Sequence, residues 1–419
     1  MKILIENGNV CSLDLPLKFA QKLYAEFAIR HPNAFYLRTR QRGMQNWDGK
    51  IHYINKHGEF KIGLLPAVYE KCIEYGIKPK VVDMRQPLPK VNGVVTKIGE
   101  YKLRPEQEKA VKAVINNKVD KVPFQIGVLD YTVNAGKTLI MSSLYLSYKK
   151  QLKTLLITND SDWLNQARDE FKKYLPGEQI TFVQGKVLNW SNFTIGMVQS
   201  ISRNMRFYQN ELAKIDMVLV DEADQAGSKQ YQNVLTRLFN TRVRIGLSGT
   251  IYMSKLAKDK VKNMKLEVFF GKVLAEFKLK DSIKKGYSTR TIVKMVPSKP
   301  WYGNWESEEV SYKEVYDDSI TFNKYARRMV YSRLKWNLKQ GRYPALVVCK
   351  FIAHCENLCK YFKKKLGSKY NIACVHVDTP SKIRQQIMKD FREGKIDILV
   401  STTIIARGKN FPKLRYLLN

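Results

Sequence analysis

The chain has 419 residues, and its 73 lysines and arginines exceed its 38 aspartates and glutamates, for a formal net charge of +35. A chain of this length is too long for one ordinary core and predicts two or three domains. With 44% hydrophobic residues it can bury such cores, which excludes a disordered basic tail protein. So large a positive excess on folded domains indicates a nucleic-acid partner, with an anionic membrane surface as the alternative.

Neither a membrane span nor a secretory signal is visible in the sequence. We find no apolar run of about 18 residues, and the N-terminus MKILIENGNV lacks an apolar core and a small-residue cleavage site. We therefore expect a cytoplasmic protein without a membrane partner. Six scattered cysteines predict no disulfide framework. One group admits a metal site, although its helical spacing favours buried or helix-face thiols: Cys349, His354, Cys355 and Cys359.

The chain order of apolar patterns predicts three domains. Residues 1–95 mix strand-like runs at 2–6, 35–40 and 50–54 with helical patterns near 17–29 and 67–75, as expected of a small α+β domain. In residues 96–275 helices alternate with the apolar runs TLLIT, FTIGM, MVLVD and RIGLSG, and in residues 276–419 with ALVVC, IACVHV and DILVST. Such alternation is typical of parallel sheets covered on both faces. The predicted fold class is α/β, with two parallel-sheet lobes after an α+β domain.

The segment LDYTVNAGKTLIMSS places Gly-Lys-Thr between an apolar run and a helical pattern. At such a helix start, backbone N–H groups face phosphates, Lys137 supplies a cation and the Thr138 hydroxyl can hold Mg²⁺. Gly136 lets the backbone approach a ligand. The motif is imperfect, because Tyr131 stands where its first glycine belongs and Asn134 replaces a small residue. Taken alone, this segment is equally compatible with a structural turn.

A second motif, MVLVDEAD, adds acidic residues directly after an apolar strand. Parallel sheets bind ligands at the carboxyl ends of their strands. There Asp221 would complete the Mg²⁺ shell, and Glu222 would orient or deprotonate the attacking water. The alternative is a solvated acidic turn. The run RIGLSGT brings Ser248 and Thr250 to the end of a further strand.

Taken together, these motifs resemble those of the superfamily 2 helicases and translocases over about 320 residues. LRPEQ resembles the adenine-side motif, TVNAGKT motif I, LITNDSDW motif Ia, DEAD motif II, SGT motif III, ALVVCKF motif IV and STTIIARGKNFP motif V. The resemblance implies two RecA-like lobes, ATP and Mg²⁺ in the cleft between them, and single-stranded nucleic acid across both. It implies nucleotide contacts from Arg104, Gln107, Thr132, Asn134, Ala135, Gly136, Lys137, Thr138, Asp221, Arg407 and Gly408; nucleic-acid contacts from Asn159, Gln199, Ser200 and Thr402; and coupling through Ser248 and Thr250.

One element of the family pattern, motif VI with its catalytic arginines, does not occur before Asn419. Without such an arginine we expect slow hydrolysis, since it can supply about a thousandfold in rate or more. We interpret the chain as a shortened version of a longer protein, because LRYLLN breaks off inside an apolar run.

The N-terminal domain, with its NWDG turn, resembles that of the phage UvsW-type helicases, which are branch-migration and fork-reversal motors. Arg38, Arg40 and Arg42 alternate along a predicted strand and would share one face, with Lys50 nearby. We expect these cations to contact duplex phosphates, against the alternative of a solvated basic strand. Trp47 is not assigned to base stacking. The basic stretch 255–290 is interpreted as a solvated face, and the aromatic loop 301–310 as packing or docking.

The expected function is an ATP-dependent DNA helicase or translocase that remodels branched DNA, acting as a monomeric motor in a host cell cytoplasm if it is a phage enzyme. Its expected partner is forked or branched DNA with duplex and single-stranded parts. The alternatives are a non-catalytic branched-DNA-binding module, an RNA helicase and, less favoured, a restriction-system motor subunit. Polarity, preferred DNA structure and partner proteins are not encoded in any recognisable pattern.

Overall fold

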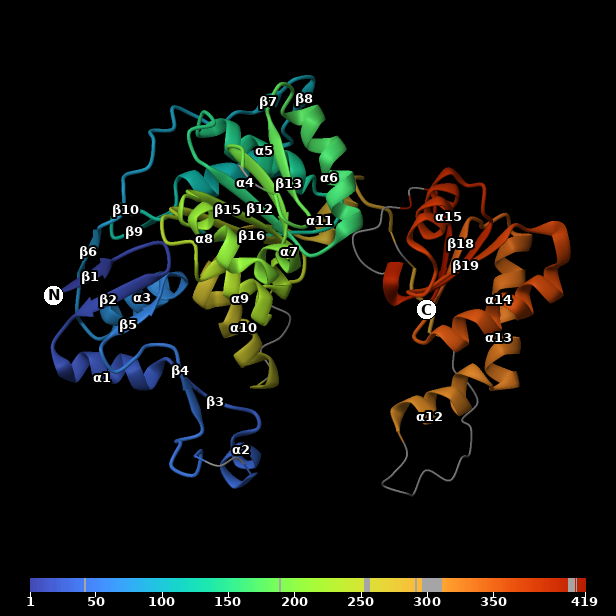
Figure 1. The fold of residues 1–419 in the computed structure, drawn as a ribbon, viewed down its shortest axis with the longest axis horizontal. Helices are drawn as coiled ribbons and strands as arrows, with labels where there is room; N and C mark the ends of the chain where they lie inside the picture. The colour runs from blue at the N-terminus through green and yellow to red at the C-terminus, as the bar shows by residue number, and fades with distance from the viewer. Residues whose placement is uncertain are drawn as a thin grey trace. The chain divides into compact units, whose positions relative to one another are not determined.

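The computed structural model describes residues 1–40, 43–187, 190–251, 257–290, 292–295, 311–405, 411 and 413–419. The chain forms two compact units, Met1–Arg290 and Thr291–Asn419 (Figure 1). Among the described residues, no helix combines the length and apolar character needed to cross a membrane.

The N-terminal part of the first unit is built on a four-stranded mixed sheet. Its strand order is β5-β2-β1-β6, with β1 parallel to β6 and antiparallel to β2. Two helices pack on it with β-branched and leucine side chains, which confirms the expected α+β character. The elements are β1 Lys2–Ile5, β2 Val10–Asp14, α1 Leu17–Glu26, β5 Glu59–Lys61, the short helix η1 Ile62–Leu64, α3 Leu65–Glu74 and β6 Lys80–Asp83.

A separate excursion leaves this part between α1 and β5. It consists of the two-stranded ribbon β3 Ala28–Arg30 and β4 Lys50–His52, with the helix α2 Ala34–Arg40 between them. The prediction of a strand over 35–40 was therefore wrong. An alternating pattern of side chains predicts a strand only where one face of that strand is buried, and here Phe35 and Tyr36 are both exposed. Because residues two apart on a helix diverge by about 200°, Arg38 and Arg40 do not share one face.

The core of the first unit is a seven-stranded, wholly parallel sheet of order β13-β14-β12-β15-β16-β11-β17. The four apolar runs that predicted this sheet form four of its strands. They are apolar because both faces of the sheet are covered, so that alternate residues enter two separate cores. The strands are β11 Ile126–Tyr131, β12 Thr154–Thr158, β13 Ile180–Val183, β14 Phe193–Met197, β15 Met217–Asp221, β16 Val243–Ser248 and β17 Val273–Phe277.

Helices cover both faces of this sheet. One core receives α4, α5 and α6, and the other receives α8, α9 and α10 together with the N-terminal part. The helices are α4 Pro105–Ile115, α5 Lys137–Ser147, α6 Ser161–Tyr174, α7 Val198–Arg203, α8 Met205–Ala213, α9 Lys229–Leu235, α10 Ala257–Phe270 and α11 Leu279–Lys284. Two small ribbons, β7 Lys97–Ile98 with β8 Tyr101–Lys102 and β9 Lys118–Val119 with β10 Val122–Pro123, flank α4.

The second unit contains a four-stranded parallel sheet of order β19-β20-β18-β21. Its elements are α12 Tyr312–Tyr316, α13 Lys324–Lys339, β18 Ala345–Cys349, α14 Ile352–Leu366, β19 Ile372–Val375, α15 Ser381–Glu393, β20 Ile398–Thr402 and β21 Tyr416–Leu418. The predicted α/β class with two parallel-sheet lobes is confirmed. The predicted boundaries at 95 and 275 remain predictions.

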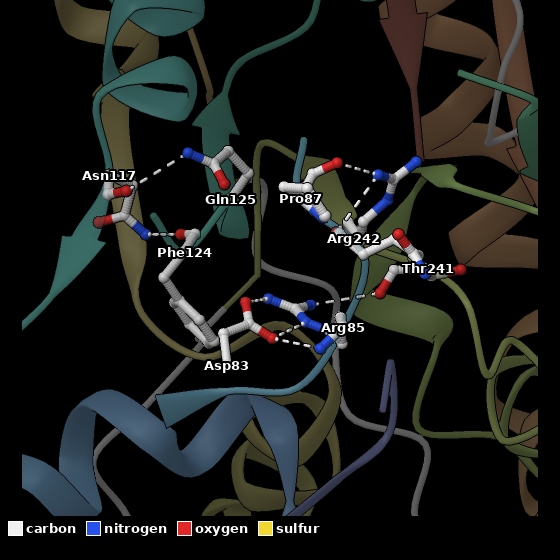
Figure 2. A network of polar contacts seen from close by, with 9 residues as sticks. Asp83, Arg85, Pro87, Asn117, Phe124, Gln125, Thr241 and Arg242 are labelled. Atoms are coloured by element: carbon white, nitrogen blue, oxygen red, sulfur yellow. Dashed lines mark hydrogen bonds and ion pairs between the residues drawn. The ribbon is translucent and has the colours of Figure 1, made fainter. Parts of the chain in front are cut away.

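The N-terminal part is fastened to the large sheet by arginines. Arg244, at the start of β16, is 0% exposed and donates from Nη2 to the Gly8 carbonyl and the Asn9 side chain, both at 2.8 Å. Burial lowers the pKa of Arg244 to about 9. Figure 2 shows the strap after β6: Arg85 binds Asp83 and reaches the Thr241 carbonyl, and Arg242 donates to the Pro87 carbonyl. The N-terminal part and the large sheet are therefore packed together as one compact unit.

Candidate functional site

The loop between β11 and α5 has the backbone of a phosphate-binding turn. Asn134 has φ 63° and Gly136 has φ 75°, both in the left-handed region. Asparagine is one of the few side chains that tolerates this region, which accounts for its presence in the loop. A Cβ at Gly136 would overlap the Gln107 amide, so glycine is required there for space as well. Lys137 and Thr138 then begin α5, where free N–H groups face any bound anion.

The departure at Tyr131 has a structural explanation. Tyr131 ends β11, is fully buried, and donates its hydroxyl to the Glu106 carbonyl at 2.7 Å. It lies in the sheet and fastens α4, so the glycine-requiring turn begins only after it. Thr132 starts that turn with its N–H bonded to the Phe277 carbonyl at 3.0 Å, and Ala135 is buried beneath it.

The acidic motif lies at the same edge of the sheet. Lys137 Nζ is 3.4 Å from Asp221 Oδ1 and 3.7 Å from Glu222 Oε1. Asp221 is 3% exposed, and its burial raises its pKa, an effect that Lys137 opposes. Glu222 has φ 51°, a left-handed conformation that costs a non-glycine residue about 1 kcal/mol. Strain of this kind concentrates at functional positions.

These residues fit a magnesium ion. Apart from the ion pair with Lys137, Asp221 Oδ1 has no hydrogen-bond partner among the described residues, although it is buried. Thr138, half-buried in the first turn of α5, supplies a hydroxyl from the adjoining element. Hard oxygen ligands of this type suit Mg²⁺, which usually binds one or two protein oxygens together with phosphates.

The residues expected beside adenine contact the phosphate loop itself. Arg104 Nη2 donates to the Asn134 carbonyl at 3.2 Å, and Gln107 Nε2 donates to the Ala135 carbonyl at 2.9 Å. The Arg104 guanidinium also lies over the Tyr287 ring, 4.3 Å from its centroid. Lys285 Nζ binds Glu106 Oε2 at 2.7 Å. The sequence had not singled out Tyr287 or Lys285, which lie after α11 and far from α4 in the chain.

The second and third motifs are joined by a hydrogen bond. Ser248, at the end of β16, donates from Oγ to Asp224 Oδ1 at 3.1 Å, and the Thr250 N–H donates to the same Ser248 oxygen at 3.2 Å. Of the residues predicted for coupling, Ser248 thus contacts the acidic motif directly and Thr250 contacts it through Ser248.

Two of the predicted nucleic-acid residues are linked by hydrogen bonds to Gln225, the residue that follows the acidic motif. Asn159 Nδ2 donates to Gln225 Oε1 at 2.5 Å, and Gln199 Nε2 donates to the Asn159 carbonyl at 3.1 Å. We call Gln199, Asn159 and Gln225 the amide relay. Gln225 had no signal in the sequence beyond its place after DEAD. Ser200, beside Gln199 in α7, accepts a hydrogen bond from Asn204 through its carbonyl at 2.8 Å.

The remaining predicted residues are distributed elsewhere. Thr402 ends β20 in the second unit and is buried. Arg38 and Arg40 lie in α2, and Lys50 begins β4. Arg42, Arg407, Gly408 and the aromatic loop 301–310 lie outside the described residues.

The cysteine group of the second unit consists of buried thiols. Cys355 Sγ lies 3.4 Å from Cys374 Sγ, and all six cysteines of the chain are free. His354 is hydrogen bonded to the Tyr316 hydroxyl at 3.0 Å. Within the described part of the chain, no group of three or more His, Cys, Asp or Glu has an arrangement that could hold a metal ion. The favoured interpretation was buried or helix-face thiols: Cys349 is buried at the end of β18, and Cys355 and Cys359 are buried on α14.

Comparison with known families adds two matches. Residues 100–253 match the model described as "Type III restriction enzyme, res subunit", and residues 327–419 match "Helicase conserved C-terminal domain". The putative ATP-dependent helicase IRC3 of Saccharomyces cerevisiae is 24% identical over 344 residues, which are 75% of this chain and 46% of that protein. The putative ATP-dependent RNA helicase L396 of Acanthamoeba polyphaga mimivirus is 25% identical over 35% of this chain and 27% of its own length. The chain thus spans less than half the length of these curated relatives.

Solved structures share the fold. T4 UvsW matches all of this chain and 83% of that chain with a TM-score of 0.51 at 18% identity. A second structure, of the UvsW helicase from bacteriophage T4, gives a TM-score of 0.52 at 20% identity, over 66% of this chain and 100% of that chain. S. cerevisiae Dbp5 bound to RNA and ADP BeF3 gives 0.50 at 17% identity, covering 76% of this chain and 74% of that chain.

Proposed function

We propose that this chain is a superfamily 2 helicase, as its matches to the two family models support. It would act as an ATP- and Mg²⁺-dependent DNA motor that remodels branched DNA by branch migration, fork reversal or unwinding. The observation that carries the proposal is the ion-pair cluster of Lys137 with Asp221 and Glu222 at the carboxyl edge of a parallel sheet. There a lysine and a helix N-terminus for phosphate stand beside carboxylates for a metal and a water.

Each of these side chains has a distinct task in hydrolysis. Lys137 leaves its carboxylate partners to bind the β- and γ-phosphate oxygens, which develop charge in the transition state. Thr138 and Asp221 would hold Mg²⁺, which would supply charge neutralisation for the phosphates. Glu222, whose backbone is held in a left-handed turn, orients the attacking water. Arg407 and Gly408 remain predicted nucleotide contacts, and Thr402 a predicted DNA contact.

Communication with nucleic acid is supported by hydrogen bonds on the protein side. Asp224 is bonded to Ser248, and the amide relay joins Gln225 to Asn159 and Gln199. A change at the acidic motif on binding ATP therefore alters the bonding of residues proposed to contact the DNA backbone. This is a physical route for coupling, because Asn159 bonds Gln225 through its side chain and Gln199 through its backbone carbonyl.

Three features support a nucleic-acid substrate, and the second and third support branched DNA in particular. The net charge of +35 favours a phosphate backbone. The N-terminal part carries Arg38, Arg40 and Lys50 on an excursion from its sheet. The fold resembles that of the T4 UvsW helicase along the whole chain. We propose a monomeric motor acting in replication, recombination or repair of phage DNA in a host cell cytoplasm.

The test is ATP turnover by the protein with single-stranded DNA, forked DNA, blunt duplex or RNA, beside the Lys137→Ala variant. The proposal predicts strongest stimulation by forked DNA and its loss in the variant, with fork affinity largely retained. Stimulation by RNA alone would instead support an RNA helicase, as the names of some relatives suggest. Tight fork binding without any turnover would reduce the protein to a branched-DNA-binding module.

A further inference from the structure

The excursion between α1 and β5, residues 28–52, is here named the α2 arm. Its stem is the β3–β4 ribbon, in which Ala28 pairs with His52 and Arg30 with Lys50. Figure 1 shows α2 at the tip, away from the four-stranded sheet of the N-terminal part. The base is fixed to α1 by the stacked rings of Tyr24 and His52, whose centroids are 4.0 Å apart. The arm is therefore an anchored projection.

The turn that precedes β4 is held by polar contacts and one tryptophan. Trp47 donates from Nε1 to the Lys50 carbonyl at 2.9 Å and lies edge-on to His31. Asp48 accepts from the Lys50 N–H at 2.9 Å and contacts His52 Nε2 at 2.6 Å. These contacts use Trp47 to shape the turn, as its place in an Asn-Trp-Asp-Gly sequence suggested. The turn before β4 is thus held by contacts that do not involve the aromatic residues of α2.

Those aromatic residues face solvent. Ala34 alone in α2 is buried, packed where Gly49 leaves room, whereas Phe35 is 79% and Tyr36 is 55% exposed. A phenylalanine stabilises a fold by being buried, so folding of the arm gains little from the exposed Phe35. The Arg40 guanidinium lies over the Tyr36 ring, 5.1 Å from its centroid. An exposed flat ring and a ring-cation pair are therefore presented on one short helix.

The positive charge around these rings favours an anionic partner. Residues 28–52 contain five arginines and lysines against a single acidic residue, Asp48. Asp48 is already committed to the turn. An occupant must offer flat apolar faces next to closely spaced anions, and nucleobases flanked by phosphates combine both. In fully paired DNA the base faces are stacked on one another, so the rings require an unpaired or junction base.

We propose that the α2 arm reads DNA branch points by stacking Phe35 on an unstacked base, while Arg38, Arg40 and Lys50 contact the flanking phosphates. The inference rests on the proposed DNA-remodelling function and deepens it, because it assigns structure recognition to a single side chain. It also corrects the expectation that the arginines act as a row on a strand face: Arg38 and Arg40 lie on a helix, with Arg40 over the Tyr36 ring.

The test places the fluorescent base 2-aminopurine at the branch point of a forked DNA and compares Phe35→Leu with Phe35→Trp, without ATP. Wild type and Phe35→Trp should quench the fluorescence by stacking, and Phe35→Leu, which keeps apolar area but no ring, should not. We expect Phe35→Leu to lower fork affinity about tenfold while leaving blunt-duplex affinity unchanged. Phe239→Leu, at an exposed aromatic residue outside the arm, should match wild type.

Retained quenching and fork affinity in Phe35→Leu would overturn the inference, and so would an equal loss of fork and duplex affinity. Because Phe35 is exposed, the variant should unfold at the wild-type temperature, which is measured alongside. DNA-stimulated ATP turnover separates this inference from the function on which it rests. Wild-type turnover with an unaffected Phe35→Leu contradicts only the arm, whereas absent turnover with intact quenching contradicts only the motor.

Discussion

Asp221 is the residue whose environment is most unusual in the candidate site. Its folded-state pKa lies above the ordinary value of 3.8, because burial penalises the carboxylate more than Lys137 stabilises it. The folded protein therefore binds this proton more tightly than the unfolded chain does. Above pH 3.8 the residue reduces stability progressively, until it ionises in the folded state as well.

Removing the neighbouring cation should enlarge this effect. Lys137→Met deletes the charge 3.4 Å from Asp221 Oδ1, which raises the folded pKa further. We expect the variant to lose about 1 kcal/mol more unfolding free energy at pH 8 than at pH 5. Denaturant unfolding of both proteins across this range measures the difference. In an Asp221→Asn background the same substitution should have a nearly constant cost, and a strong remaining pH dependence there would contradict the assignment.

The sequence predicted the positions of these residues but not their contacts. An apolar run followed by acids predicts a strand end, and a parallel sheet brings all strand ends to one edge. That reasoning suffices to bring Lys137 near Asp221. The contacts of Arg104 and Gln107 with the Asn134 and Ala135 carbonyls depend instead on how α4 packs on the loop, which no local pattern encodes.

At the scale of elements, the buried strands were predictable from the sequence, whereas the exposed segment at 35–40 was not. The runs at β12, β14 and β15 coincide with the predicted apolar segments, because both faces of a covered parallel sheet demand apolar residues. The alternating run at 35–40 forms α2, since an arm with no core places no constraint on the period. Arg244 and Gln225 also escaped prediction, because their partners lie far away in the sequence or in another motif.

The amide relay gives a prediction about coupling between elements. Gln225→Ala removes the acceptor of the Asn159 side chain but leaves the carboxylates of the nucleotide site in place. We expect basal ATP turnover to stay within about twofold and stimulation by DNA to fall about tenfold. Steady-state turnover with and without forked DNA measures both. Asn159→Ala should show the same defect, and a double variant with two additive losses would contradict a shared relay.

Arg244 gives a prediction about docking of the N-terminal part. Arg244→Ala leaves a cavity and removes the donor to the Gly8 carbonyl and the Asn9 side chain. We expect a loss of about 2–4 kcal/mol in unfolding free energy and faster proteolysis in the strap around residues 83–87. Arg237→Ala, at an exposed arginine after α9, should change stability by less than about 0.5 kcal/mol. Equal stability of the two variants would show that the buried guanidinium does not hold this interface.

At the scale of the whole molecule, charge and fold support the same proposal. A net charge of +35 attracts any nucleic acid, so affinity alone does not distinguish a motor from a binding module. The distinction lies in whether ATP hydrolysis at Lys137, Asp221 and Glu222 produces movement of DNA strands. Docking of the N-terminal part through Arg244 makes it one body with the lobe that carries those residues. Under the proposed function, force generated there would be transmitted to DNA held by the α2 arm.

The most direct measurement is therefore strand exchange on a synthetic DNA junction whose branch point can migrate, followed by fluorescence energy transfer with ATP or ADP. The account predicts exchange with ATP and Mg²⁺ only, and none in Glu222→Gln, which should still bind ATP and the junction. Exchange at equal rates with ADP, or a tightly bound junction that never moves with ATP, would contradict it.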